Sequence, residues 1–70
     1  MMKMVHKEYR VDKAKIGFIK FILEAHEGVA VATTLDAKNG LIRLAIAPDR
    51  MESAQMIVEE LKKDFMFNEV

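Results

Sequence analysis

The 70-residue sequence predicts a two-layer α+β domain in which two helices cover one face of a small sheet. Three observations lead to this prediction. Residues 4–11 alternate polar and apolar side chains, as half-buried strands do. Residues 13–27 and 49–64 instead repeat apolar side chains at helical spacing. Asn39 and Gly40, which tolerate positive φ, separate two further strand-like segments and indicate a hairpin.

The first strand leads directly into the first helix. Alternation places Val5, Tyr9 and Val11 on the helix-facing side of the strand. Asp12 is expected to cap the helix N-terminus, and Gly28 is expected to end the helix. Apolar residues cover about 220° of this helix, whereas packing on one sheet needs a stripe of roughly 100°. The surplus predicts a further contact through Phe18 and Phe21, either with the second helix or with another chain.

The hairpin is predicted to join strands at residues 29–35 and 41–47 through a turn at residues 36–40. Alternation assigns to the helix-facing side Val29, Val31, Thr33, Leu35, Ile42, Leu44 and Ile46. The opposite face would then carry Ala30, Ala32, Thr34, Arg43, Ala45 and Ala47. A solvated sheet face is normally richer in long polar side chains. The alanines therefore predict that another sheet or backbone packs closely on this face, and an exposed face of short side chains is the alternative.

The second helix begins after Pro48, where Asp49 and Glu52 match a capping box. Its core-facing stripe comprises Met51, Ala54, Ile57, Val58, Leu61 and Phe65. Residues 65–70 form either a short fourth strand or a loose tail. The length allows a single domain, over residues 1–70, and the order of its elements is β-α-β-β-α with a right-handed crossover. Its fold is a ferredoxin-like sandwich, with an antiparallel-rich sheet and both helices on one face.

Composition narrows the classes of function. There is no cysteine, which excludes disulfides and thiolate metal sites and fits a cytoplasmic protein. A domain this small commonly gains stability by oligomerisation. The formal net charge of zero argues against a nucleic-acid binder, which usually carries a basic excess. No apolar run approaches the length of a membrane span.

No catalytic, metal or cofactor site is predicted. Ser53 has no histidine near it in sequence, and His6 and His26 lie on different elements without ligand-like spacing. A ligand site is expected instead at the first strand-to-helix turn, where Gly17 accompanies Asp12, Lys13 and Lys15. Backbone amides at such a turn can meet an anion. Tight packing of Gly17 against a neighbour, or an unoptimised surface position, is the alternative.

The run from Ile16 to Gly28, followed by Thr34-Leu35-Asp36, resembles an uncharacterised bacterial family, number 4911 in the series of domains of unknown function. The similarity covers most of the chain and implies no function. More distantly, the succession of strand, Asp12, Gly17, helix, Gly28 and hairpin resembles ACT-type regulatory domains. That resemblance implies a ferredoxin-like module that pairs its sheets or helices and binds an amino acid near the first strand-to-helix loop.

These observations favour a non-enzymatic regulatory or small-ligand-binding module that forms a homo-oligomer, with a dimer as the expected state. The ligand would be a small anion or an amino acid, and Phe18, Phe21, Ala30, Ala32, Ala45 and Ala47 would form the interface. Two alternatives remain. Nucleic-acid binding would need aromatic residues on the open sheet face, but Tyr9 is predicted to face the helices. An acylphosphatase-like enzyme would need a phosphate-cradling loop, but Arg10 precedes a lysine-rich stretch.

Overall fold

The computed structural model describes residues 3–26 and 28–70. Its elements follow the predicted order, with a short 3-10 turn before each helix. In chain order they are β1 (Val5–Val11), a 3-10 turn (Lys13–Lys15), α1 (Ile16–Ala25), β2 (Ala30–Asp36), β3 (Leu41–Ile46), a second 3-10 turn (Pro48–Arg50), α2 (Met51–Lys62) and β4 (Phe67–Glu69). The predicted end of the first helix, Glu27, lies outside the described residues.

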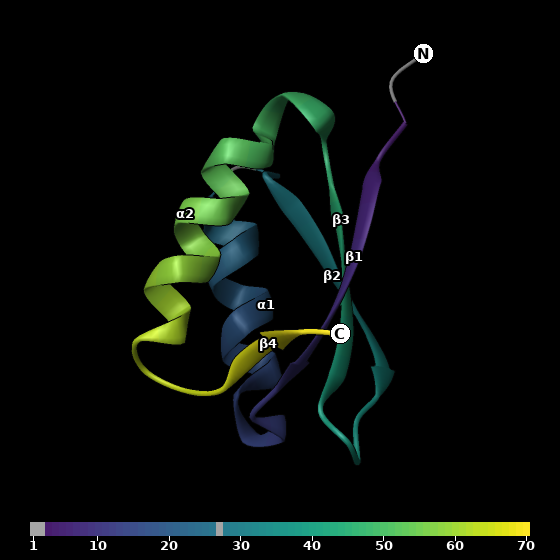
Figure 1. Cartoon of the computed structure of the whole chain (residues 1–70), viewed down its shortest axis with the longest axis vertical. Helices are drawn as coiled ribbons and strands as arrows, with labels where there is room; N and C mark the ends of the chain where they lie inside the picture. The colour runs from purple at the N-terminus through teal and green to yellow at the C-terminus, as the bar shows by residue number, and fades with distance from the viewer. Residues whose placement is uncertain (1–2, 27) are drawn as a thin grey trace.

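The four strands form one antiparallel sheet in the order β2-β3-β1-β4. Both helices lie on the same side of this sheet, and β4 runs along the outer side of β1 (Figure 1). The predicted ferredoxin-like α+β fold is therefore confirmed. Of the two alternatives for the C-terminal segment, the structure has the fourth strand, which continues with a hydrogen bond of 3.0 Å from the Val70 amide to the Glu8 carbonyl.

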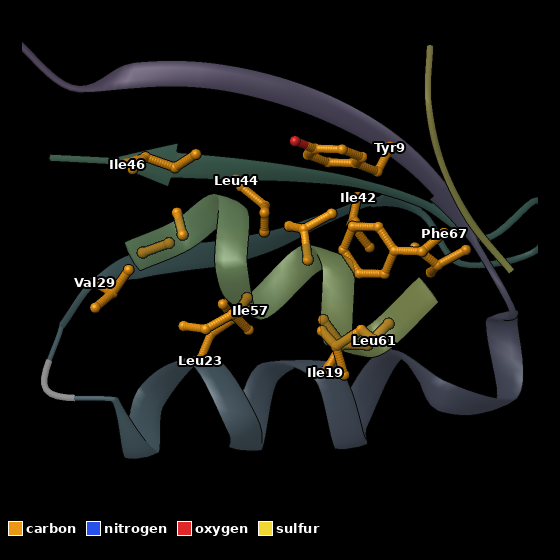
Figure 2. Packing of buried hydrophobic residues seen from close by; sticks show 14 residues of the cluster. Tyr9, Ile19, Leu23, Val29, Ile42, Leu44, Ile46, Ile57, Leu61 and Phe67 are labelled. Carbon is orange, nitrogen blue, oxygen red and sulfur yellow. The ribbon is translucent and has the colours of Figure 1, made fainter. Parts of the chain in front are cut away.

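A hydrophobic core fills the space between the helices and the sheet. Figure 2 shows Ile19 and Leu23 of α1 directed toward α2 and the sheet, and both side chains are buried. The predicted α2 stripe is confirmed, since Ala54, Ile57, Val58 and Leu61 are buried. β4 adds Phe67, and the centroid of its ring lies 4.9 Å from the centroid of the Tyr9 ring.

Three turns meet at one end of the sheet around Asp12. Its carboxylate accepts a hydrogen bond of 3.0 Å from the Ala14 amide, so the predicted N-cap is confirmed, although it caps the 3-10 turn rather than α1 itself. The Asp12 amide donates to the Met66 carbonyl at 3.2 Å. Next to it, the Val11 amide donates to the Gly40 carbonyl at 2.8 Å. The backbone around Asp12 thus ties the hairpin turn and the loop before β4 to the start of α1.

The hairpin turn is stabilised by Asp36 and Asn39. The Asp36 carboxylate accepts hydrogen bonds from the Asn39 side-chain amide at 2.7 Å and from the Asn39 backbone amide at 3.3 Å. These bonds favour the ionised carboxylate and lower the pKa of Asp36. Gly40 follows with a positive φ of 65°, as the sequence predicts for this turn.

The predicted alternation of β2 is wrong by one residue. Val29 is buried in the bend before the strand, and Ala30, the first residue of β2, is buried beside it. Ala32 pairs with the buried Leu44 and therefore lies on the helix-facing side, whereas Val31 pairs with Ala45 on the open side. The residues of β2 that face away from the helices are thus Val31, Thr33 and Leu35, and all three are exposed.

Close packing of α1 on β2 explains this shift. Short alanine side chains at positions 30 and 32 let the helix lie close to the strand, and Val29 closes the end of the core from outside the strand. The predicted alternation starts the strand at Val29, whereas β2 starts at Ala30. Ala30 and Ala32 consequently do not belong to the open face, whereas Ala45 does.

The predicted capping box of the second helix is also wrong. Pro48, Asp49 and Arg50 form a 3-10 turn that begins after Ala47, and no side chain caps it. The Arg50 amide bonds to the Ala47 carbonyl at 2.8 Å, so the backbone of this turn satisfies itself. Arg50, the last residue of this turn, immediately precedes α2 and lines a groove between the two helices.

Candidate functional site

A groove of about 700 Å³ lies between α1 and α2. Its walls are mostly apolar, with Phe18, Ile22, Ala25, Val29, Met56, Ile57 and Leu61 among its lining residues. Phe18 keeps 47% of its surface exposed and Met56 keeps 66%, so both present apolar surface to solvent. Small-molecule sites typically have volumes of about 300–1,000 Å³ with apolar walls and a few polar groups. The groove has the size and the lining of such a site.

One end of the groove is cationic. The end of α1 brings His26 there, and the start of α2 brings Arg50 and Ser53. Arg50 takes part in no ion pair within residues 3–26 and 28–70. A guanidinium with five donors beside a serine hydroxyl suits the recognition of a carboxylate or another small anion.

The other end of the groove is acidic, with Glu60 and Asp64 in its lining. Lys63 lies 3.4 Å from the Glu60 carboxylate, and both side chains are largely exposed, so this negative charge is partly balanced in solvent. The two ends therefore differ in sign. An elongated ligand with one anionic end would align with that end near Arg50.

Ser53 and His26 line the same groove although they are far apart in sequence. Nucleophilic catalysis needs the serine hydroxyl within hydrogen-bond reach of the base. No hydrogen bond joins these two side chains in the part of the chain that the structure describes.

The predicted ligand residues Asp12, Lys13, Lys15 and Gly17 lie together at the first strand-to-helix turn, but none of them lines the groove. The Asp12 carboxylate is already engaged in capping. Lys13 and Lys15 are exposed on the 3-10 turn. A Cβ atom added at Gly17 would meet nothing within 4 Å, so tight packing inside this chain does not explain the glycine.

Phe18 and Phe21, which were expected to make the same extra contact, face different surroundings. Phe18 lines the groove, and its ring meets that of Phe65 edge-on with 6.2 Å between ring centroids. Phe21 lies outside the groove lining and keeps 66% of its surface exposed. The second helix therefore accounts for part of the surplus apolar surface of α1 but leaves Phe21 uncovered.

Among the described residues, the open face of the sheet carries mostly charged and short side chains and no Phe, Tyr or Trp. Its members include His6, Glu8, Arg10, Val31, Thr33, Arg43 and Ala45. Tyr9 is buried on the helix-facing side, as predicted. Single-stranded nucleic acids are bound on such sheets by stacking on several aromatic side chains, and His6 is the one aromatic ring on this face among the described residues, so the face does not favour the nucleic-acid alternative.

The sequence did not identify most of the groove. Arg50, Ser53 and Met56 lie a helix and a hairpin away from Phe18 and Ile22, and only the tertiary fold brings them together. One signal was available in the sequence, since Met56 is an apolar residue outside the core-facing stripe of α2. Within residues 3–26 and 28–70 no cluster of three His, Asp or Glu side chains can hold a metal. In the same ranges, neither helix is long and apolar enough to cross a membrane.

Fold and groove together define a small ferredoxin-like α+β domain with an apolar cleft between its helices, cationic at one end. A family model described as Domain of unknown function (DUF4911) matches residues 9–64. The chain therefore belongs to this family, as the resemblance of its first helix and hairpin predicted. No curated protein and no solved structure matches the chain.

Proposed function

We propose that this protein is a non-enzymatic module that binds a small anionic ligand with an apolar body in the groove between α1 and α2. This proposal is carried by one observation: the walls of the groove are apolar, and Arg50 at one end of it forms no ion pair among residues 3–26 and 28–70. The apolar body would lie against Ile22 and Met56. The anionic group would accept hydrogen bonds from Arg50.

Binding fits the groove better than catalysis does. His26, Arg50 and Ser53 meet at one end of the groove, and no hydrogen bond among the described residues joins Ser53 to His26 as a nucleophilic mechanism needs. The expected affinity is modest, because Phe18 and Met56 leave the groove open to solvent and only part of a ligand would be buried. Reversible binding of this kind suits a regulatory module, which is also what the resemblance to ACT-type domains implies. An amino acid with an apolar side chain is one ligand of this class.

The module is proposed to act in the cytoplasm as a homo-oligomer, with the dimer as the smallest unit. The lack of cysteine supports the compartment. Exposed apolar side chains at Phe21 and Val31, which are 66% and 58% exposed, support association, because a chain of this size gains stability by covering them.

Octanoate is a suitable probe, because it joins a carboxylate to a flexible apolar chain. In a titration followed by amide chemical shifts, octanoate should perturb Ile22, His26 and Ser53 at the groove. Octanol, which has the same chain without the charge, should perturb the same apolar residues only at higher concentration. Arg50→Glu should remove the preference for octanoate over octanol.

Lys15→Glu is the matched control, because it reverses one positive charge at the first strand-to-helix turn, outside the groove lining. It should leave octanoate binding unchanged. If Lys15→Glu abolishes the carboxylate preference and Arg50→Glu does not, the ligand site is the turn at residues 12–17. If neither octanoate nor octanol perturbs any groove residue, the groove is not a site for apolar anions.

A further inference from the structure

We infer that two copies of this chain associate through the free edge of β2, which pairs antiparallel with β2 of the second copy about a two-fold axis at Thr33. This inference names the interface of the homo-oligomer and rests on the association proposed above. It is carried by the unequal protection of the two sheet edges, by the self-complementary sequence of β2 and by the side of α1 that borders this edge.

The two edges of the sheet differ in length and in charge. β4 forms one edge with only three residues, one of which is Glu69. β2 forms the other edge with seven residues, Ala30–Asp36, and its only charged residue is the last one. Soluble proteins protect edge strands with lysine, proline, short length or a cover. The bulge of β2, between Thr34 and Asp36, lies at the turn end and leaves most of the strand regular. A long edge strand whose one charge lies at its last residue is a template for another strand.

The sequence of β2 suits pairing with itself. A two-fold axis normal to the sheet keeps each face on its own side, so residues of the same face must lie opposite each other. An axis at Thr33 places Val31 opposite Leu35 of the second copy. Val31 is 58% exposed and Leu35 is 40% exposed in the single chain. Such pairing brings these two apolar side chains together across the seam, the line along which the two β2 strands meet.

The charged residue of β2 tolerates this register. Asp36 follows the bulge and pairs with Leu41, so it lies on the open face outside the regular pairing of residues 31–35, and no like charges meet. Thr33 would lie opposite Thr33 of the second copy, a pair that is favourable between strands. Moving the axis to Ala32 would pair Val31 with Thr33, and moving it to Thr34 would carry Val31 past the end of the partner strand. The axis at Thr33 is therefore the one that uses the regular part of the strand, from Val31 to Leu35.

The helix beside this edge supports the same seam. α1 packs on β2, so joining the β2 edges brings the two α1 helices near each other on one side of the extended sheet. Phe18, Ile22 and Ala25 mark the side of α1 that lines the groove. At 100° per residue, the other flank carries Gly17, Lys20 and Glu24, and Phe21 lies at the outer margin of this flank.

This second flank has the features of a contact surface. Phe21 is 66% exposed, and the space around Gly17 is open. In an antiparallel pair of helices, Lys20 of one copy and Glu24 of the other are complementary charges. The seam thus gives Phe21 and Gly17 a role that neither the core nor the groove supplies.

Charges of opposite sign introduced at Thr33 test the position of the axis directly. Thr33 is exposed on the open face, so Thr33→Lys and Thr33→Glu should both leave the fold intact by circular dichroism. Each variant alone places like charges opposite each other and should dissociate several-fold more readily in sedimentation velocity. An equimolar mixture of the two variants should recover the association of the natural chain. A second pair, Val31→Lys mixed with Leu35→Glu, should recover it as well, because these positions lie opposite each other.

Asn68→Lys and Asn68→Glu are the matched controls on the opposite edge strand, and both should associate like the natural chain. A natural chain that stays monomeric at every concentration overturns both the homo-oligomer and this interface. A dimer that both Thr33 variants leave unchanged overturns the β2 interface alone. If the single variants dissociate but their mixture does not recover, the two-fold axis does not pass through Thr33.

Discussion

Among the glycines, Gly40 is the one at which an added methyl group should destabilise the fold most. Its φ is 65°, and a Cβ atom there would collide with the carbonyl oxygen of Val11. Gly28 has a similar φ of 76°, but nothing lies within 4 Å of its added Cβ. The two positions therefore separate the cost of a left-handed backbone from the cost of a backbone collision.

Gly40→Ala should lower the free energy of unfolding by more than about 2 kcal/mol, because the Val11 carbonyl cannot move aside without turning the Asp12 amide of the same peptide group away from the Met66 carbonyl. Gly28→Ala should cost only about 1 kcal/mol, the usual cost of the left-handed conformation. Gly17→Ala lies in a helix with open space around it and should be neutral or stabilising by up to about 1 kcal/mol. Urea denaturation of the three variants measures the order, and a Gly40→Ala variant as stable as Gly28→Ala would contradict the collision.

At the scale of the elements, β1 and β4 are joined by a buried aromatic pair. Tyr9 packs on Phe67, with Glu69 opposite it in the strand register. Burial raises the pKa of the Tyr9 hydroxyl above its usual value, and the negative charge of Glu69 raises it further. The unfolded chain therefore ionises at lower pH than the folded one. Stability is retained below the ordinary tyrosine pKa of about 10 and decreases as the pH rises toward the folded pKa.

Glu69→Gln should lower the pKa of Tyr9 but leave it above the ordinary value, since burial is the larger cause. Tyr9 is the only tyrosine and there is no tryptophan, so an absorbance titration follows this one hydroxyl. Glu52→Gln on α2, which is not among the causes of the shift, should leave the titration unchanged. A Tyr9 pKa that does not fall in the Glu69→Gln variant would mean that β4 does not hold Glu69 beside Tyr9 in solution.

Element type and order follow from the sequence because alternation and helical spacing are local properties. The side that a strand presents depends also on where the strand begins, and Val29 shows the limit. Hydrophobicity ranks valine above alanine for the core, so a pattern that starts at Val29 directs the valines inward. The structure instead needs short side chains at Ala30 and Ala32, because α1 packs on this strand.

The candidate groove was predictable only in part, for a related reason. The wide apolar arc of α1 indicates that Phe18 and Ile22 cover more than the sheet needs. Which residues face them depends on how α2 lies across the domain, and that orientation is a property of the whole fold. Arg50 adds a further difficulty, because the sequence assigns the start of α2 to a capping box and the structure has a 3-10 turn there.

At the scale of the whole molecule, two modes of self-association are open to the exposed apolar side chains of the helical layer. Copies can join side by side at the β2 edge, which covers Phe21, or face to face through the helices, which would cover Met56 as well. Phe21 and Met56 are equally exposed, each at 66%. They lie on different helices, and only Met56 lines the groove. This makes them a matched pair for distinguishing the two modes.

Phe21→Asp should weaken dimerisation by about tenfold or more, since an aromatic side chain buried in an interface typically contributes about 1–4 kcal/mol. The fold should be unaffected, because the ring is largely exposed in the single chain. Met56→Asp should leave dimerisation unchanged if the copies join at the β2 edge, because α2 lies on the β1–β4 side of the sheet, away from the seam. Sedimentation equilibrium gives both dissociation constants, and circular dichroism verifies that both variants fold. If Met56→Asp weakens the dimer as much as Phe21→Asp does, the helical layers pack face to face, and the groove would then be covered by the second copy instead of a small anion.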